Sequence, residues 1–102
     1  MWGKEERRII SFLTSSSGNL EMLEALEKLG RADIKKWMEE SGTEDESIFR
    51  KRLEELMNYG LVSKTVEEDE IKKEYYFLTQ KGESILSFIK STKKKLRKTG
   101  VR

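Results

Sequence analysis

Apolar residues recur at helical spacing in four successive segments before the pattern changes to the alternation of a strand. Residues 4–14 and 19–29 each carry an apolar stripe beside charged positions, which predicts two amphipathic helices. A third, short helix is predicted over 32–40, and a fourth over about 43–59. Trp37 shares the spacing of its apolar neighbours in the third helix, so we expect it in the core rather than at a binding site.

Capping residues set the predicted ends of these helices. Asn19 is placed to cap the second helix, and Gly30 stops it. Gly42 provides the turn after the third helix. Thr43 and Glu46 have the spacing of a capping box, in which each side chain accepts a hydrogen bond from the other's free backbone N–H, and they are expected to open the fourth helix.

A β-hairpin and a last helix complete the predicted fold. Gly60 is expected to adopt a left-handed conformation, after which residues 61–66 and 72–78 alternate as two strands around a polar turn. Thr79 should cap the last helix, and Gly82 should let strand and helix approach each other closely. The fold class is therefore mostly α with a small β-hairpin, in the order ααααββα.

Two segments carry a resemblance to a known family. Residues 53–62 read LEELMNYGLV and residues 75–82 read YYFLTQKG. The first is similar to the end of the recognition helix and the first wing strand of winged helix-turn-helix transcription regulators of the MarR-like and PadR-like kind. The second resembles their second wing strand and the LTxxG start of the next helix. The resemblance covers residues 19 to about 89.

The resemblance implies a partner and a set of contacts. In such proteins the helix after the turn enters the major groove of double-stranded DNA and the hairpin wing contacts the backbone. The DNA-binding residues it implies on the fourth helix and wing are Thr43, Ser47, Ile48, Arg50, Lys51, Lys64, Lys72 and Lys73. Ser47 and Arg50 can hydrogen-bond base edges, whereas the lysines would contact phosphates.

Acidic residues interrupt this surface and leave a second interpretation open. Residues 44–46 read EDE and residues 67–70 read EEDE, where contact with phosphate would be repulsive. The first group also has a purely structural interpretation, because acids favour the start of a helix. The alternative function is a winged-helix protein interaction module that uses its acidic surfaces and binds no DNA.

Charge and apolar residues divide the chain into three parts. Residues 1–18 form an accessory helix, 19–89 the winged helix-turn-helix domain, and 90–102 a basic tail with seven bases and no acid. Apart from an ordinary role at a helix end, this tail can contact the DNA backbone, through Lys93, Lys94, Lys95, Arg97 and Lys98. The accessory and last helices carry apolar residues that need a partner, in the same chain or in a homodimer. The predicted dimer interface consists of Trp2, Ile9, Ile10, Phe12, Leu13, Ile85, Phe88 and Ile89.

Composition removes several function classes. The chain has no cysteine and no histidine, so the commonest metal ligands and the usual general base are missing, and we expect no enzyme, no metal and no cofactor. The apolar runs are too short to cross a membrane or form a signal peptide, which together with the lack of cysteine indicates a cytoplasmic protein. Abundant lysine and glutamate favour a thermophilic source, whereas the absence of proline argues against one.

Overall fold

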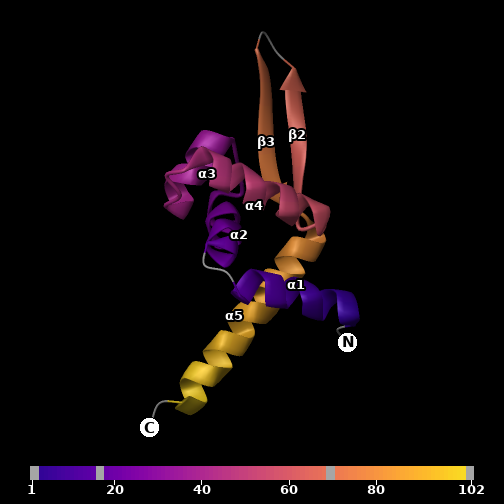
Figure 1. Cartoon of the computed structure of the whole chain (residues 1–102), viewed down its shortest axis with the longest axis vertical. Helices are drawn as coiled ribbons and strands as arrows, with labels where there is room; N and C mark the ends of the chain where they lie inside the picture. The colour runs from indigo at the N-terminus through magenta and orange to yellow at the C-terminus, as the bar shows by residue number, and fades with distance from the viewer. Residues whose placement is uncertain (1–2, 16–17, 69–70, 101–102) are drawn as a thin grey trace.

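The computed structural model describes residues 3–15, 18–68 and 71–100, with side chains described as far as residue 92. In these residues five helices lie below and to one side of the base of a small sheet, from which a long hairpin projects (Figure 1). The helices are α1 (Lys4–Ser15), α2 (Asn19–Leu29), α3 (Ile34–Ser41), α4 (Glu46–Asn58) and α5 (Gln80–Gly100); the strands are β1 (Arg31–Ala32), β2 (Val62–Glu68) and β3 (Lys72–Leu78). The predicted mostly α fold with a hairpin is confirmed, with β1 as an additional strand between α2 and α3.

The core lies between the helical body and the base of the hairpin. Trp37 is fully buried there, packs edge-to-face on Phe49 with ring centroids 5.0 Å apart, and donates its indole N–H to the carbonyl of Met22 at 2.8 Å. Tyr76 of β3 also packs against Trp37, with ring centroids 5.8 Å apart. Trp37 is therefore a core residue, as its spacing predicts, and it joins α2, α3, α4 and the sheet.

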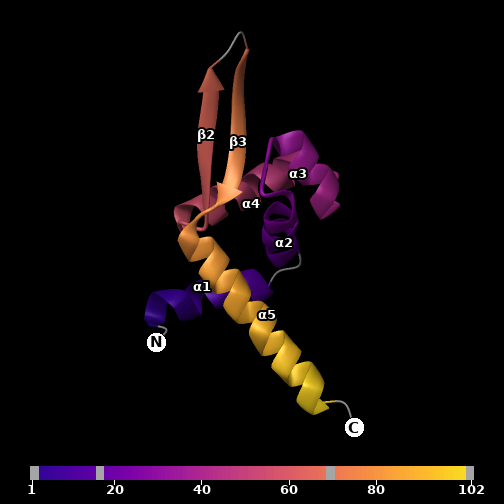
Figure 2. The same cartoon turned by 180° about the vertical axis from the view of Figure 1, so that it is seen from behind.

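The three strands form one antiparallel sheet in the order β1-β3-β2. Tyr76 and Leu78 point into the core and Tyr75 and Phe77 lie on the other face, as predicted from the alternation. Beyond the part paired with β1, β2 and β3 continue together as a hairpin that extends away from the helices (Figures 1 and 2). This hairpin, residues 62–78, is called the wing below.

The junction between α4, the wing and α5 depends on two glycines. Gly60 has φ +78° and ends α4, and the next amide, that of Leu61, donates to the carbonyl of Leu56 at 3.0 Å. The hydroxyl of Thr79 accepts from the backbone N–H of Gly82 at 3.0 Å and donates to the carbonyl of Gly60. A Cβ at Gly82 would lie 2.2 Å from the Leu61 carbonyl oxygen, so the predicted close approach is confirmed.

Two predicted capping residues are wrong. The residue that caps α4 is Asp45, so the helix begins at Glu46 and Thr43 lies in the preceding turn. Asp45 is better placed than Thr43 because its carboxylate reaches the free N–H groups of both Ser47 and Ile48. Asn19 belongs to α2, and the carboxylate of Glu21 caps that helix by accepting from the N–H of Gly18 at 2.8 Å.

Helices α1 and α5 pack against each other within one chain, below the winged body (Figure 2). Ile9 and Leu13 of α1 and Ile85 and Ile89 of α5 are at most 6% exposed and belong to the shared core. Ile10 and Phe12 are partly buried against it, and Phe88 is 38% exposed. Trp2 lies outside the described residues. Most of the apolar residues that were expected to need a partner are therefore covered by other residues of the same chain.

Candidate nucleic-acid interface

Helix α4 presents a continuous polar face to solvent. Phe49, Leu53 and Leu56 anchor the helix in the core. The opposite side carries four residues of the predicted DNA-binding set, all of them exposed: Ser47, Ile48, Arg50 and Lys51. Ile48 is 46% exposed and is an apolar contact point at the start of this helix.

The start of this face is a hydrogen-bonded turn around Asp45. Its carboxylate accepts from the Ser47 hydroxyl at 2.7 Å and from the backbone N–H groups of Ser47 and Ile48 at 2.9 and 3.2 Å. These bonds, led by that from the Ser47 hydroxyl, hold the pKa of Asp45 below its ordinary value. The acid at this position therefore has a structural role, and the hydroxyl of Ser47 is already engaged in the absence of a ligand.

Arg50 and Glu46 form an ion pair one helical turn apart. Nε of Arg50 lies 2.7 Å from Oε2 of Glu46, and both side chains remain more than half exposed. The hydrogen bond to Glu46 is the main reason that the pKa of Arg50 is raised, and the negative charges of Glu46 and of Glu74 on β3 add to it. Lys51 differs, because among the residues whose side chains are described it has no ion-pair partner.

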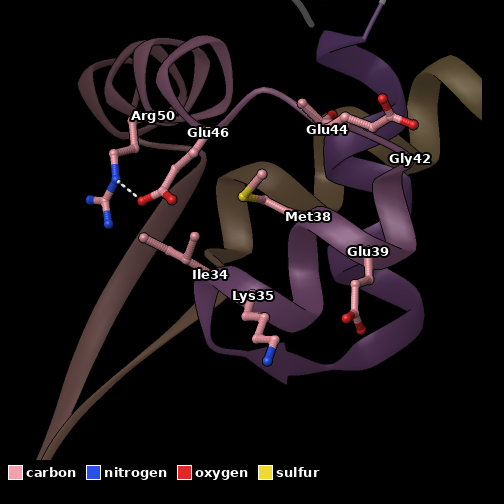
Figure 3. A pocket seen from close by; sticks show the side chains of 9 residues that line it. Ile34, Lys35, Met38, Glu39, Gly42, Glu44, Glu46 and Arg50 are labelled. Carbon is pink, nitrogen blue, oxygen red and sulfur yellow. Dashed lines mark hydrogen bonds and ion pairs between the residues drawn. The ribbon is translucent and has the colours of Figure 1, made fainter.

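A surface pocket of about 700 Å³ lies between α3 and the start of α4 (Figure 3). Ile34 and Met38 give it an apolar wall, and the Glu46–Arg50 pair stands at one side. Thr43 also lines this pocket and accepts a hydrogen bond from the Ser41 hydroxyl at 3.1 Å. The turn between the two helices is thus a concave surface next to the exposed face of α4.

The wing carries paired charges. Nζ of Lys64 lies 3.6 Å from the Glu74 carboxylate across the two strands. Lys72 and Lys73 are exposed and stand opposite Glu68 and Glu67 in the strand register. Every predicted DNA-binding lysine of the wing therefore has an acid beside it, so the described part of the wing is not a simple basic surface.

Arg31, which sequence reasoning missed, holds the wing to the body. Its guanidinium lies 4.4 Å from the ring centroid of Tyr75 and 2.9 Å from Oε2 of Glu67. The residue belongs to β1, which pairs with β3 at Phe77 and Tyr76. Two residues are too few for an alternating pattern, and Glu67 is distant in sequence, so no local signal marks this contact.

The basic tail continues the last helix. The backbone of α5 is helical to Gly100 and extends beyond the body, on the side away from the wing (Figures 1 and 2). The side chains of Lys93, Lys94, Lys95, Arg97 and Lys98 lie outside the described side chains. Lys90 is described, and it pairs with Glu27 of α2 at 2.5 Å, which fixes α5 to the body where the tail begins.

Two other kinds of site were sought in the described part of the chain. No group of three or more acidic, histidine or cysteine side chains there could hold a metal ion. Within the same residues, no helix has the length and apolar character needed to span a membrane.

Known proteins resemble this chain in fold and not in sequence. The sequence matches no protein-family model and no curated protein. A structure of diamide-treated YodB from B. subtilis superposes with a TM-score of 0.83 at 20% identity, covering 96% of this chain and 95% of that one. The chain has the winged helix fold. A putative MarR-family transcriptional regulator from Enterococcus faecalis V583 gives a TM-score of 0.82 at 15% identity, covering 98% and 90% of the two chains.

A more distant solved structure shares the winged helix fold. BpsR from Bordetella bronchiseptica, described as a protein whose DNA binding is regulated by 6-hydroxynicotinic acid, gives a TM-score of 0.69 at 14% identity over 94% of this chain and 77% of that one. These structures confirm the predicted winged helix fold. The superposition covers almost the whole chain, so the likeness also includes α1 and α5. At these identities the likeness concerns the fold.

Proposed function

We propose that this protein is a DNA-binding transcriptional regulator of the cytoplasm, without enzymatic activity, that acts as a homodimer. The observation that carries the proposal is that almost the whole chain superposes on transcriptional regulators while its α4 exposes a face of hydrogen-bonding and basic side chains. In the winged-helix mode of DNA binding, such a helix lies in the major groove and the wing contacts the adjacent backbone.

The proposed contacts fall into two groups. Ser47 and Arg50 face the base edges, with Thr43 and Ile48 beside them, because they lie at or near the start of α4. Lys51 contacts a phosphate, and Lys64, Lys72 and Lys73 of the wing contact the backbone. The basic tail adds contacts that do not depend on sequence, through Lys93, Lys94, Lys95, Arg97 and Lys98.

Dimerisation is proposed through α1 and α5. Four residues of the predicted interface are buried in the core of one chain: Ile9, Leu13, Ile85 and Ile89. Their proposed role in the dimer is indirect, because they hold α1 and α5 in the positions from which other side chains contact the partner. The direct contacts then involve Ile10, Phe12 and Phe88, together with Trp2. A twofold arrangement would present two α4 helices to two half-sites on DNA.

The test is the affinity for random duplex DNA across a salt series, measured by fluorescence anisotropy with the full chain and with Lys51→Glu. We expect binding at low salt that weakens steeply as salt rises, and a clear loss for Lys51→Glu because it reverses a charge facing phosphate. The matched control is Lys4→Glu, the same charge change on α1, away from the wing. Equal losses in both variants would contradict groove binding by α4.

The contribution of the tail needs its own variant. Replacing Lys93, Lys94 and Lys95 with glutamine in the full chain should make the salt dependence shallower by about 0.9 for each phosphate that the tail no longer neutralises. Binding that disappears in this variant but is unaffected by Lys51→Glu would assign the binding to the tail and not to α4.

A second candidate function is a protein interaction module, which the acids of the proposed DNA face favour. Glu44 is exposed beside the capped start of α4, and Glu67 and Glu68 lie on the wing. These acids would meet a basic partner protein and repel phosphate. Failure of the full chain to bind any duplex at low salt would reject the DNA proposal and leave this one.

A further inference from the structure

We infer that Glu46 and Arg50 act together as a specificity device, which rejects generic DNA and accepts a site where a guanine and a cytosine lie within their joint reach. The inference rests on the proposed function and assigns to the ion pair a role beyond holding the helix. It makes Glu46 a residue that lowers non-specific affinity and contributes to recognition.

The first step is that Arg50 is already paired. Its Nε donates to Oε2 of Glu46 at 2.7 Å. Glu74, whose negative charge also raises the pKa of Arg50, is itself paired with Lys64 at 3.6 Å. Arg50 is therefore not free in the unbound protein, although it is the one arginine among the predicted base-reading residues.

The second step is that Glu46 is not needed for the helix cap. Asp45 supplies the cap and uses its carboxylate on the amides of Ser47 and Ile48. Glu46 is the first residue of α4, its side chain is 59% exposed, and it bonds only to Arg50 among the described residues. An acid whose main contact is the neighbouring arginine is available to a ligand together with that arginine.

The third step is what DNA offers to such a pair. A phosphate that bonds to the remaining guanidinium N–H groups of Arg50 would also lie close to the carboxylate of Glu46, which repels it. A guanine offers the acceptors O6 and N7 to the guanidinium, and a cytosine offers its N4 amino group to a carboxylate. Base edges of this kind satisfy both side chains at once, whereas a phosphate satisfies Arg50 alone.

The position of the pair agrees with this role. Glu46 and Arg50 stand beside the concave surface between α3 and α4, on the first turns of α4 (Figure 3). Residues at the start of a recognition helix are those that reach base edges. Ile48 lies on the other flank of α4, with Phe12 and Lys51, and takes no part in this pair.

The experiment compares the wild-type full chain with Glu46→Gln on two readouts. One is the affinity for random duplex across a salt series; the other is the base preference selected from a duplex library with a randomised centre. Glu54→Gln is the matched control, because it removes the same charge from the exposed face of α4 at a residue with no ion pair in the described part of the chain. Circular dichroism checks that all three proteins are folded.

We expect Glu46→Gln to bind random duplex more tightly than wild type, with a salt dependence steeper by about one unit because Arg50 becomes available to a phosphate. The preference for guanine and cytosine at the selected position should fall about fivefold or more. Glu54→Gln should change neither the base preference nor the slope by a comparable amount.

Three outcomes would overturn the inference. If Glu46→Gln behaves like wild type, or if Glu54→Gln reproduces its effects, the pair has no specific role, while the regulator proposal stands. If Glu46→Gln loses affinity for every duplex, the pair supports the helix and does not select bases. If no variant, and not the wild type, binds any duplex at low salt, the proposed function itself fails.

Discussion

At the residue scale, the close contact at Gly82 shows how one missing side chain joins two elements. The Leu61 carbonyl oxygen would lie 2.2 Å from a Cβ at this position, and as a backbone atom it cannot move aside alone. We expect Gly82→Ala to destabilise the fold by about 1–3 kcal/mol, the usual cost of overpacking, although alanine is the better helix former. Urea unfolding followed by circular dichroism measures this.

The control for that prediction lies two residues further along α5. Ser84 is exposed, so Ser84→Ala changes helix propensity without a steric conflict and should be neutral or slightly stabilising. If Gly82→Ala were as stable as Ser84→Ala, the tight contact between Leu61 and α5 would not exist in solution.

Asp45 gives a pH-dependent prediction at the same scale. Its pKa is lowered in the folded protein by bonds from Ser47 and Ile48, so its contribution is present above the pKa of the unfolded chain and is lost as the pH falls through the folded value. Asp45→Ala should therefore lower the thermal midpoint at neutral pH, and the gap to wild type should close in acid, below about pH 4. A gap that stays constant over this range would contradict the capping role.

At the element scale, the wing depends on a contact with the body that the hairpin alone does not provide. Arg31 stacks on Tyr75 and pairs with Glu67, which ties β1 to both wing strands. We expect Arg31→Gln to raise amide hydrogen exchange in β2 while global stability falls by less than about 1 kcal/mol, because the pair is half exposed.

The matched control breaks another surface ion pair of the same length. Lys28 pairs with Glu40 at 2.9 Å, between α2 and α3, so Lys28→Gln should leave exchange in the wing unchanged. An increase in β2 exchange of the same size in both variants would mean that the wing responds to general loosening and not to Arg31.

The same scale shows what the sequence could predict. Helices α2 and α4 and both wing strands follow from periodicity and glycine punctuation, because those signals are local. The two-residue strand β1 leaves no pattern, and the cap of α4 fell on Asp45 because two acceptors compete within three residues. The Glu46–Arg50 pair has the i,i+4 spacing that sequence reasoning could have used, whereas the contact between Arg31 and Glu67 spans 36 residues and required the fold.

At the scale of the whole molecule, the apolar residues that stay exposed on one chain are the ones available to a second copy. Ile9, Leu13, Ile85 and Ile89 are in the core of one chain, so membership of an apolar stripe could not separate internal from external contacts. Phe88 of α5 lies beside the buried Ile89 in the sequence and is 38% exposed. It is the described residue through which dimerisation is most directly tested.

We expect light scattering at tens of micromolar to give a dimer mass for wild type and a monomer mass for Phe88→Glu, because a carboxylate would be desolvated in an apolar interface. DNA affinity should fall with it, since two linked half-site contacts become one. Ile71→Glu is the control, an equivalent change at a 68% exposed aliphatic residue of the wing, and it should leave the mass unchanged. A monomeric wild type would refute the dimer proposal. A dimeric Phe88→Glu would show that Phe88 is outside the interface and leave Ile10 and Phe12 of α1 as the residues to test.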